Sequence, residues 1–282
     1  MIDDPSFFSV CAFFSFWLGA SIASFLNVVI WRVPRGESIV SPPSHCPKCN
    51  AAIRWYQNIP ILAWLALRGR CANCREPISP RYVLVELLGG LLFLATFWWY
   101  WPGLDTTVPA LFAHWALNQL VVWIWISLMI AGSFIDFDHQ LLPDFVTVGG
   151  MVLGLAFNGV ISILLRTPSC ILLSLAGLVL GFGLLWLIRF FGSKAFGREA
   201  MGMGDVFLMG AVGALFGPVA VLVTVVLSSL VGSVVGLALI ALAKARLGGF
   251  TAIPFGPYIC LGCLGWMFFG TELVNWYVGF FR

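Results

Sequence analysis

Long apolar segments dominate this chain and restrict what it can fold into. Of its 282 residues, 61% are hydrophobic and only 10% are charged, whereas a soluble domain is roughly half apolar and one quarter charged. About 20 consecutive apolar residues cross the hydrocarbon core of a bilayer as one helix. The sequence therefore predicts an all-α polytopic membrane protein and excludes a water-soluble globule. A net charge of +3 without a long basic run gives no reason to expect nucleic acid as a partner.

The apolar runs predict about eight transmembrane helices. They lie near residues 7–31, 82–101, 115–135, 145–165 and 170–191, followed by a short helix after Gly204, a long one ending near Ala243 and a last one from Pro257. The apolar stretch after Gly204 is too long for one span, and Gly217-Pro218 divides it. The N-terminus lacks the basic region of a secretory signal, so the first run is expected to stay in the membrane.

Basic residues concentrate in alternate connections between these spans. Thirteen of the 15 Lys and Arg residues fall within 32–81, 189–198 and 244–246, and only Arg166 and Arg282 fall elsewhere. If the spans alternate, all thirteen lie on one side of the membrane, which the positive-inside rule identifies as the cytoplasm. Both termini are then expected outside the cytoplasm. The chain divides by polarity into a first transmembrane helix (1–31), a cytoplasmic module (32–81) and a transmembrane bundle (82–282).

The cytoplasmic module carries two Cys-x-x-Cys pairs separated by 21 residues. They are Cys46 with Cys49 and Cys71 with Cys74. This spacing is typical of a tetrahedral zinc site built from two knuckles. Disulfides are disfavoured in a reducing cytosol, and isolated thiols would not need paired spacing. His45, beside the first pair, could replace a ligand. Four thiolates leave no position for water, so we expect a structural zinc that stabilises a segment too small to fold alone.

Acidic residues gather at two predicted cytoplasmic span ends. Five of the twelve lie there, namely Asp136, Asp138 and Asp144 in the first cluster and Glu199 and Asp205 in the second. Ionisable groups at membrane depth are costly and by default suggest function. Asp136 closes the third predicted helix and Asp205 opens the sixth, so both can point into the bundle from the same side.

Two such carboxylates, if they meet, supply an acid and a base. Both cannot ionise cheaply when close together, so one keeps a proton. The ionised partner can take a proton from water as it attacks a peptide carbonyl, while the other donates to the oxygen and the leaving amine. Gly202 and Gly204 would let backbone approach a substrate. The alternative without catalysis has two parts. Asp205 would only place a favourable negative charge at a helix N-terminus, and the 136–144 segment would be a solvated turn ended by Pro143.

The ordered motifs resemble a known family, the type IV prepilin peptidases, which are bifunctional leader peptidases and N-methyltransferases of the bacterial inner membrane. The resemblance covers nearly the whole chain. The motifs are ASFLNVVIWR at 23–32, SHCPKC at 44–49, NIPI at 58–61, CANC at 71–74, Arg81-Tyr82, Val85-Glu86, the 136–144 segment, GMGD at 202–205 and PFGP at 254–257. Gly-x-Gly-Asp alone is less specific, since presenilin-like intramembrane aspartyl proteases share it.

The resemblance implies an activity and its catalytic residues. The expected substrates are prepilins or type II secretion pseudopilins in the lipid bilayer, whose leader is removed at the cytoplasmic face. The catalytic pair falls on Asp136 and Asp205. Asp138, Asp144, Gly202, Gly204 and Glu199 are candidates for supporting the pair or contacting the substrate. Members often carry a Lys two residues after the second catalytic Asp, where this chain has Phe207, and Gly is usual at the position of Ala23.

The resemblance also implies methylation of the new N-terminal residue, with S-adenosylmethionine as methyl donor. No Gly-rich nucleotide loop follows a predicted strand. The module and its flanking helix ends, including Asn27 and Glu86, are the expected region for this activity. Alternatively, Glu86 is a carboxylate at a helix end that pairs with Arg81 or Arg32.

Two other functions are compatible with the sequence. One is a proton-coupled membrane transporter, although the acids cluster at one interface and no inverted repeat is evident. The other is a zinc-bearing membrane scaffold without chemistry.

Overall fold

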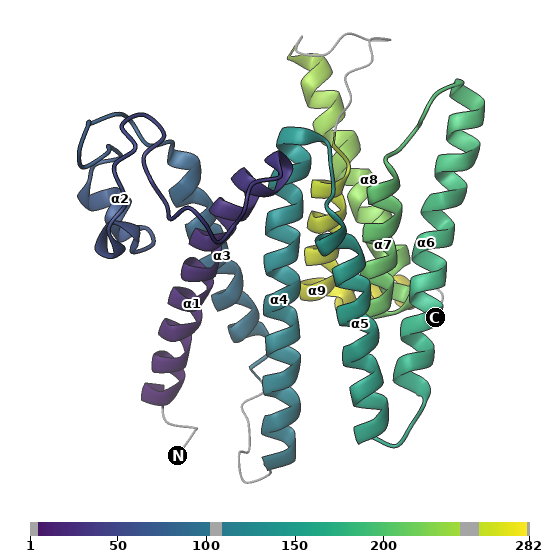
Figure 1. Ribbon diagram of the computed structural model, residues 1–282. Helices are drawn as coiled ribbons and strands as arrows, with labels where there is room; N and C mark the ends of the chain where they lie inside the picture. The colour runs from purple at the N-terminus through teal and green to yellow at the C-terminus, as the bar shows by residue number, and fades with distance from the viewer. Residues whose placement is uncertain (1–4, 102–108, 243–253, 281–282) are drawn as a thin grey trace. The chain divides into compact units, whose positions relative to one another are not determined.

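The computed structural model describes residues 5–101, 109–242 and 254–280, and within these ranges it is helical apart from turns and two isolated bridges (Figure 1). The helices are α1 Pro5–Arg32, α2 Leu62–Ala66, α3 Pro80–Trp99, α4 Pro109–His139, α5 Asp144–Leu164, α6 Ser169–Phe196, α7 Met203–Phe216, α8 Pro218–Ala241 and α9 Gly256–Gly279, with 3-10 turns η1 Val33–Arg35 and η2 Trp55–Asn58. In this part of the chain, seven helices are long and apolar enough to cross a membrane. The expected all-α polytopic fold is confirmed.

The sixth expected helix, α7, is short. Its 14 residues extend about 21 Å at 1.5 Å per residue, less than the roughly 30 Å of a bilayer core. It ends at the Gly217-Pro218 pair that the sequence indicated, where Gly217 adopts a φ of 83°. Of the basic residues used to orient the chain, Lys244, Arg246 and Arg282 lie outside the described residues.

The chain forms two compact units, and the boundary falls within α4. The N-terminal unit comprises residues 1–131 and the C-terminal unit residues 132–282. The first contains α1, the four-cysteine module, α3 and most of α4, and the second contains the end of α4 and α5 to α9. The division into 1–31, 32–81 and 82–282 follows polarity rather than compactness and stays a proposal about domain organisation.

Small residues allow α1 and α3 to pack closely in the N-terminal unit. A Cβ added to Gly19 of α1 would lie 2.5 Å from the Gly89 carbonyl oxygen, and one added to Gly89 of α3 would lie 2.5 Å from the Ala23 Cβ. Such contacts are the usual way in which membrane helices associate, because lipid offers no hydrophobic drive between them. On α4, Trp123 stacks on Phe93 of α3 with ring centroids 5.1 Å apart.

In the C-terminal unit, α7 is enclosed by its neighbours. It packs against α5 and α6 and also contacts α8 and α9 (Figure 1). Ten of its fourteen residues are buried. A Cβ on Gly177 or Gly181 of α6 would overlap the α7 backbone at Gly213 or Met209, and one on Gly154 of α5 would lie 2.6 Å from the Ala214 carbonyl carbon. These glycines let the three helices touch backbone to backbone.

Side chains from α5 and α6 donate hydrogen bonds to the carbonyl groups at the end of α7. The last carbonyls of a helix have no partner within it, and in a membrane interior water does not supply one. Asn158 Nδ2 donates to the carbonyl oxygens of Ala214 and Leu215 at 3.1 and 3.3 Å. Ser174 Oγ donates to the same Ala214 oxygen at 2.5 Å. The short helix can therefore end inside the bundle.

Candidate active site and metal centre

Asp136 lies in the last turn of α4 and is fixed by the start of α9. Its side chain is buried, and Oδ2 accepts a hydrogen bond of 3.0 Å from the backbone N–H of Gly256. Gly256 is the first residue of α9, whose N-terminus carries a partial positive charge that favours a nearby carboxylate. A Cβ on Gly256 would lie 2.6 Å from Asp136 Oδ2. The close approach therefore requires glycine at this position.

Asp205 lies in the first turn of α7 and is buried as well. The backbone N–H of Gly202 donates a hydrogen bond to its carboxylate. The second oxygen, Oδ1, is buried and has no hydrogen-bond partner among the described residues. A buried acceptor of this kind is costly in a purely structural role, because it has lost its water without gaining a donor.

The two aspartates, 69 positions apart, lie near each other in the C-terminal unit. The carboxylate of Asp136 acts electrostatically on that of Asp205, and both act on the thiol of Cys260 in α9. Leu142, in the connection between α4 and α5, lies beside both sites. A Cβ on Gly204 would be 2.8 Å from Leu142 Cβ, and a Cβ on Gly256 would be 3.2 Å from Leu142 Cδ1. The end of α4 and the starts of α7 and α9 therefore converge.

The other acidic candidates lie at the surface around this point. Asp138 and Asp144 are exposed, as is Glu199. Glu199 forms an ion pair of 2.9 Å with Arg189 of α6. These three side chains differ from the buried pair in having direct access to solvent or to a headgroup layer.

The glycines and the phenylalanine singled out in the second motif have clear contacts. Gly202 is the N-cap of α7 and supplies the N–H bound by Asp205. Gly204 leaves room for Leu142. Phe207 packs on Phe182 of α6 with ring centroids 5.5 Å apart, so the position that often carries Lys in the family is here part of an apolar contact.

Sequence reasoning missed Gly256, Leu142 and Cys260 as neighbours of the aspartates. The only available signal was the PFGP motif, since Pro in the first turn of a helix marks an N-terminus that can bind a carboxylate. The separation of 120 residues between Asp136 and Gly256 hides their contact from any local pattern.

The four module cysteines form a compact cluster. Their Sγ atoms all lie within 4.8 Å of one another, with Cys46 to Cys74 at 3.8 Å and Cys49 to Cys71 at 4.0 Å. Tetrahedral zinc with Zn–S bonds of about 2.3 Å requires sulfurs about 3.8 Å apart, so the donor set fits zinc. None of the eight cysteines, all within the described residues, forms a disulfide.

The two knuckles repeat the same local geometry. In the first, the N–H of Asn50 donates to the Cys46 oxygen at 2.9 Å, and in the second that of Arg75 donates to the Cys71 oxygen at 3.1 Å. Asn50 and Arg75 both adopt a positive φ. A hydrogen bond from the backbone N–H of Ala51 is the main cause that lowers the pKa of the Cys49 thiol to about 6. Such donors favour the thiolate that binds metal.

Asn27 and Glu86 connect the module to α1 and α3. Asn27 Nδ2 donates to the Tyr82 oxygen at 3.1 Å, which ties α1 to the start of α3. Glu86 accepts the Ile61 N–H at 2.7 Å and is hydrogen-bonded to Ser24. Both side chains are buried. His45 makes a contact of 3.1 Å through Nδ1 with the Pro43 oxygen, and it is not part of the four-sulfur cluster.

Comparison with known proteins identifies the family. Residues 17–100 match the bacterial peptidase A24 N-terminal domain, and residues 123–237 match the type IV leader peptidase family. A prepilin leader peptidase/N-methyltransferase of Myxococcus xanthus is 42% identical over 248 residues, covering 86% of this chain and 68% of the relative. The chain belongs to the type IV leader peptidase family. No solved structure matched it.

Further relatives in the family align with most of the chain. A prepilin leader peptidase/N-methyltransferase of Legionella pneumophila is 37% identical over 287 residues and covers 92% of both chains. A type 4 prepilin-like proteins leader peptide-processing enzyme of Escherichia coli is 38% identical over 262 residues, covering 86% of this chain and 88% of the relative. With seven apolar helices of membrane-spanning length among the described residues, the chain is a multi-pass protein of the bacterial inner membrane.

Proposed function

We propose that this protein removes the leader peptide of type IV prepilins or type II secretion pseudopilins at the cytoplasmic membrane face, and then N-methylates the new N-terminal residue. Relatives of up to 42% identity among those compared carry both activities in their names. The observation that carries the hydrolytic part is the convergence of Asp136 and Asp205, two buried acids from separate helices of one unit.

The pair would hydrolyse a peptide bond through an activated water. The two carboxylates hold one proton between them, because two adjacent buried charges are costly. The ionised carboxylate takes a proton from water while the water oxygen bonds to the peptide carbonyl carbon. The protonated partner gives its proton to the carbonyl oxygen. The C–N bond then breaks as the leaving amine takes the proton that came from the water, and one hydroxyl of the diol returns its proton to the carboxylate that had donated it, which restores the pair.

The surroundings hold the two acids in fixed positions. Gly256 N–H binds one oxygen of Asp136, and Gly202 N–H binds the Asp205 carboxylate. Asp205 Oδ1 makes no hydrogen bond with a described residue, so it is the atom offered to water or to the substrate oxygen. The family resemblance implies a short basic leader, and we propose that the exposed acids Asp138, Asp144 and Glu199 contact it.

Single substitutions test the pair. Asp136→Asn and Asp205→Asn each remove one carboxylate but keep its size, and each should lower leader cleavage by about 10²- to 10⁴-fold. The purified protein in detergent is incubated with a prepilin, and cleavage is followed by mass spectrometry. Glu272→Gln, an exposed carboxylate on α9, is the matched control. Full cleavage by either aspartate variant would remove the basis for a two-aspartate mechanism.

The orientation proposed from the sequence puts both termini outside the cytoplasm. The basic segments 32–81 and 189–198 then face the cytoplasm, on the same side as the two aspartates. Reporter fusions at the connection near Arg166 and at the C-terminus would report an extracytoplasmic location, and a cytoplasmic signal at either would reverse the assignment.

Two bound groups belong to this proposal. Cys46, Cys49, Cys71 and Cys74 would hold zinc, which fastens the two knuckles together and has no open position for catalysis. S-adenosylmethionine would supply the methyl group. Asn27 and Glu86 are proposed to serve methylation by holding the module on α1 and α3, since Glu86 binds the Ile61 N–H and Asn27 binds the Tyr82 oxygen.

A further inference from the structure

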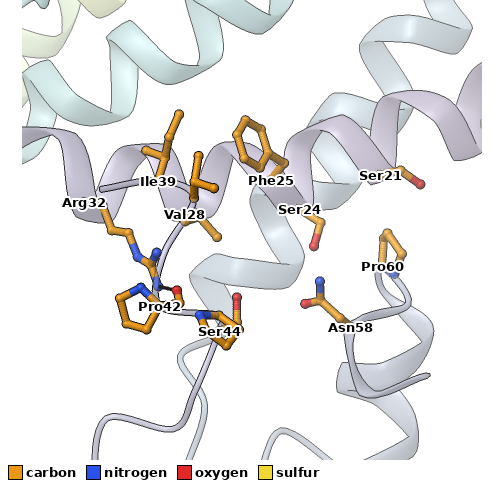
Figure 2. A pocket seen from close by; sticks show the side chains of 12 residues that line it. Ser21, Ser24, Phe25, Val28, Arg32, Ile39, Pro42, Ser44, Asn58 and Pro60 are labelled. Atoms are coloured by element: carbon orange, nitrogen blue, oxygen red, sulfur yellow. Dashed lines mark hydrogen bonds between the residues drawn. The ribbon is translucent and has the colours of Figure 1, made fainter. Parts of the chain in front are cut away.

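A pocket of about 340 Å³ lies in the N-terminal unit between one face of α1 and the module (Figure 2). Ser21, Ser24, Val28 and Arg32 line it at helical spacing, so they share that face. The module contributes the other lining residues, which are Ile39, Val40, Pro42, Pro43, Ser44, Asn58 and Pro60. The volume falls at the lower end of the range of about 300–1,000 Å³ for small-molecule sites. Neither Asn27 nor Glu86 lines it.

Arg32 is a buried cation at one end of this pocket. Its side chain donates to the carbonyl oxygens of Ser38 and Pro42 at 2.9 and 2.8 Å. Only 8% of the residue is exposed. Within the residues that the structure describes, the ion pairs do not include Arg32. A buried guanidinium without an anion is costly, and its five N–H donors fit a carboxylate in a bidentate manner. This end of the pocket is therefore suited to an anionic group.

The other end of the pocket is polar and uncharged, and an apolar wall separates the two ends. Figure 2 shows Ser24 facing Asn58, with Pro60 nearby, while Arg32 lies beside Pro42 and Ser44. Ser24 and Arg32 are eight residues apart on α1, which is about 12 Å along the helix. Phe25, Val28 and Ile39 also line the cavity. The pocket thus offers an anion site, apolar contact and hydrogen-bonding groups in that order.

We propose that this pocket binds S-adenosylmethionine, with the α-carboxylate on Arg32 and the nucleoside toward Asn58 and Ser24. The assignment rests on the proposed methyltransferase function and deepens it by naming the donor site. A molecule with a carboxylate at one end and a nucleoside with hydroxyl and ring nitrogen groups at the other matches the order of the lining. In the transfer, the S–CH₃ bond breaks to give a neutral thioether. The lone pair of the substrate amine forms the new N–CH₃ bond, and the proton of its ammonium form goes to water.

Equilibrium binding to the full-length protein in detergent tests this assignment. Arg32→Gln should weaken S-adenosylmethionine binding by about ten- to hundred-fold, as expected for loss of a charge-assisted hydrogen-bond pair. Val28→Phe, which adds bulk to the cavity lining and removes no hydrogen-bond donor of Arg32, should weaken it comparably. Arg35→Gln is the matched control, because Arg35 is exposed and stacks on Trp31 at 3.7 Å. Zinc content and leader cleavage, which do not depend on the pocket, report that each variant is folded.

A truncated ligand tests the orientation. Methylthioadenosine keeps the nucleoside and lacks the amino-acid part, so the wild type should bind it more weakly and Arg32→Gln should bind it as the wild type does. An equal penalty for both ligands, or unchanged S-adenosylmethionine binding in Arg32→Gln and Val28→Phe, would overturn the proposal. Anionic phospholipid added to the assay distinguishes a lipid phosphate, since loss of lipid binding in Arg32→Gln with donor affinity intact would also overturn it. If the wild type neither binds nor uses the methyl donor, the proposed methyltransferase function itself fails.

Discussion

The contact between Gly256 and Asp136 gives a sharp test of how the aspartates are positioned. In Gly256→Ala the new Cβ would be built 2.6 Å from Asp136 Oδ2, whereas ordinary contact begins near 3.4 Å. The carboxylate, or the start of α9, must therefore move by about 0.8 Å. The same Cβ would lie 3.2 Å from Leu142 Cδ1. Leu142 therefore limits the directions in which the new Cβ can move away from Asp136. The backbone N–H that binds Asp136 remains present in the variant.

The expected effect is on the chemical step. A misplacement of about 1 Å can cost about 10²-fold in rate, so we expect kcat/KM for leader cleavage to fall by about 10- to 100-fold, or about 1.4–2.7 kcal/mol of transition-state stabilisation. Cleavage is measured by mass spectrometry at several prepilin concentrations. Gly236→Ala on α8 and Gly149→Ala on α5 are matched controls, since a Cβ there meets nothing within 4 Å. A Gly256→Ala enzyme as active as these controls would refute the claim that this contact sets the geometry of the pair.

Two further predictions concern stability. Asn158→Leu keeps the side-chain volume but leaves the Leu215 carbonyl without that donor, so the free energy of unfolding should fall by about 1–3 kcal/mol in a denaturant titration. Ser233→Ala, whose exposed hydroxyl bonds within its own helix, should change it little, and equal losses would contradict the explanation. Cys46→Ser should release zinc, measured by metal analysis, and lower the thermal midpoint, because the metal supplies folding energy. Cys170→Ser lies outside the cluster and should keep the metal; zinc retained by Cys46→Ser would argue against the site.

The sequence predicted most of the helices and the metal cluster because their signals are local. An apolar run of sufficient length has few structures available in a membrane. Each Cys-x-x-Cys pair lies in one tight turn, so the four sulfurs converge once the two turns lie side by side. The short α7 was also foreseeable, since Gly217-Pro218 interrupts an apolar stretch and Gly217 takes a positive φ there.

The environment of the aspartates was less predictable because it depends on long-range packing. The motif around Asp205 and the acidic cluster at Asp136 marked the two residues, but the N–H of Gly256 comes from a helix 120 residues later in the chain. The side chains that donate hydrogen bonds to the last carbonyls of α7 also depend on long-range packing. Asn158 and Ser174 appear in the sequence as ordinary polar residues within apolar spans, and only the fold shows which carbonyls they bind.

The backbone contacts of α7 with α5 and α6 bear on how stiff the active site is. Side chains can exchange rotamers to absorb a disturbance, but peptide groups in contact have no such alternative arrangements. Where Gly177 and Gly181 face Gly213 and Met209, a sliding or turning α7 would drive peptide atoms into one another. Asp205 lies in the first turn of this helix, so its position is restricted in the same way. The protein therefore gains little freedom to adjust the acid to its target, and the substrate must make most of the conformational adjustment when the two come together.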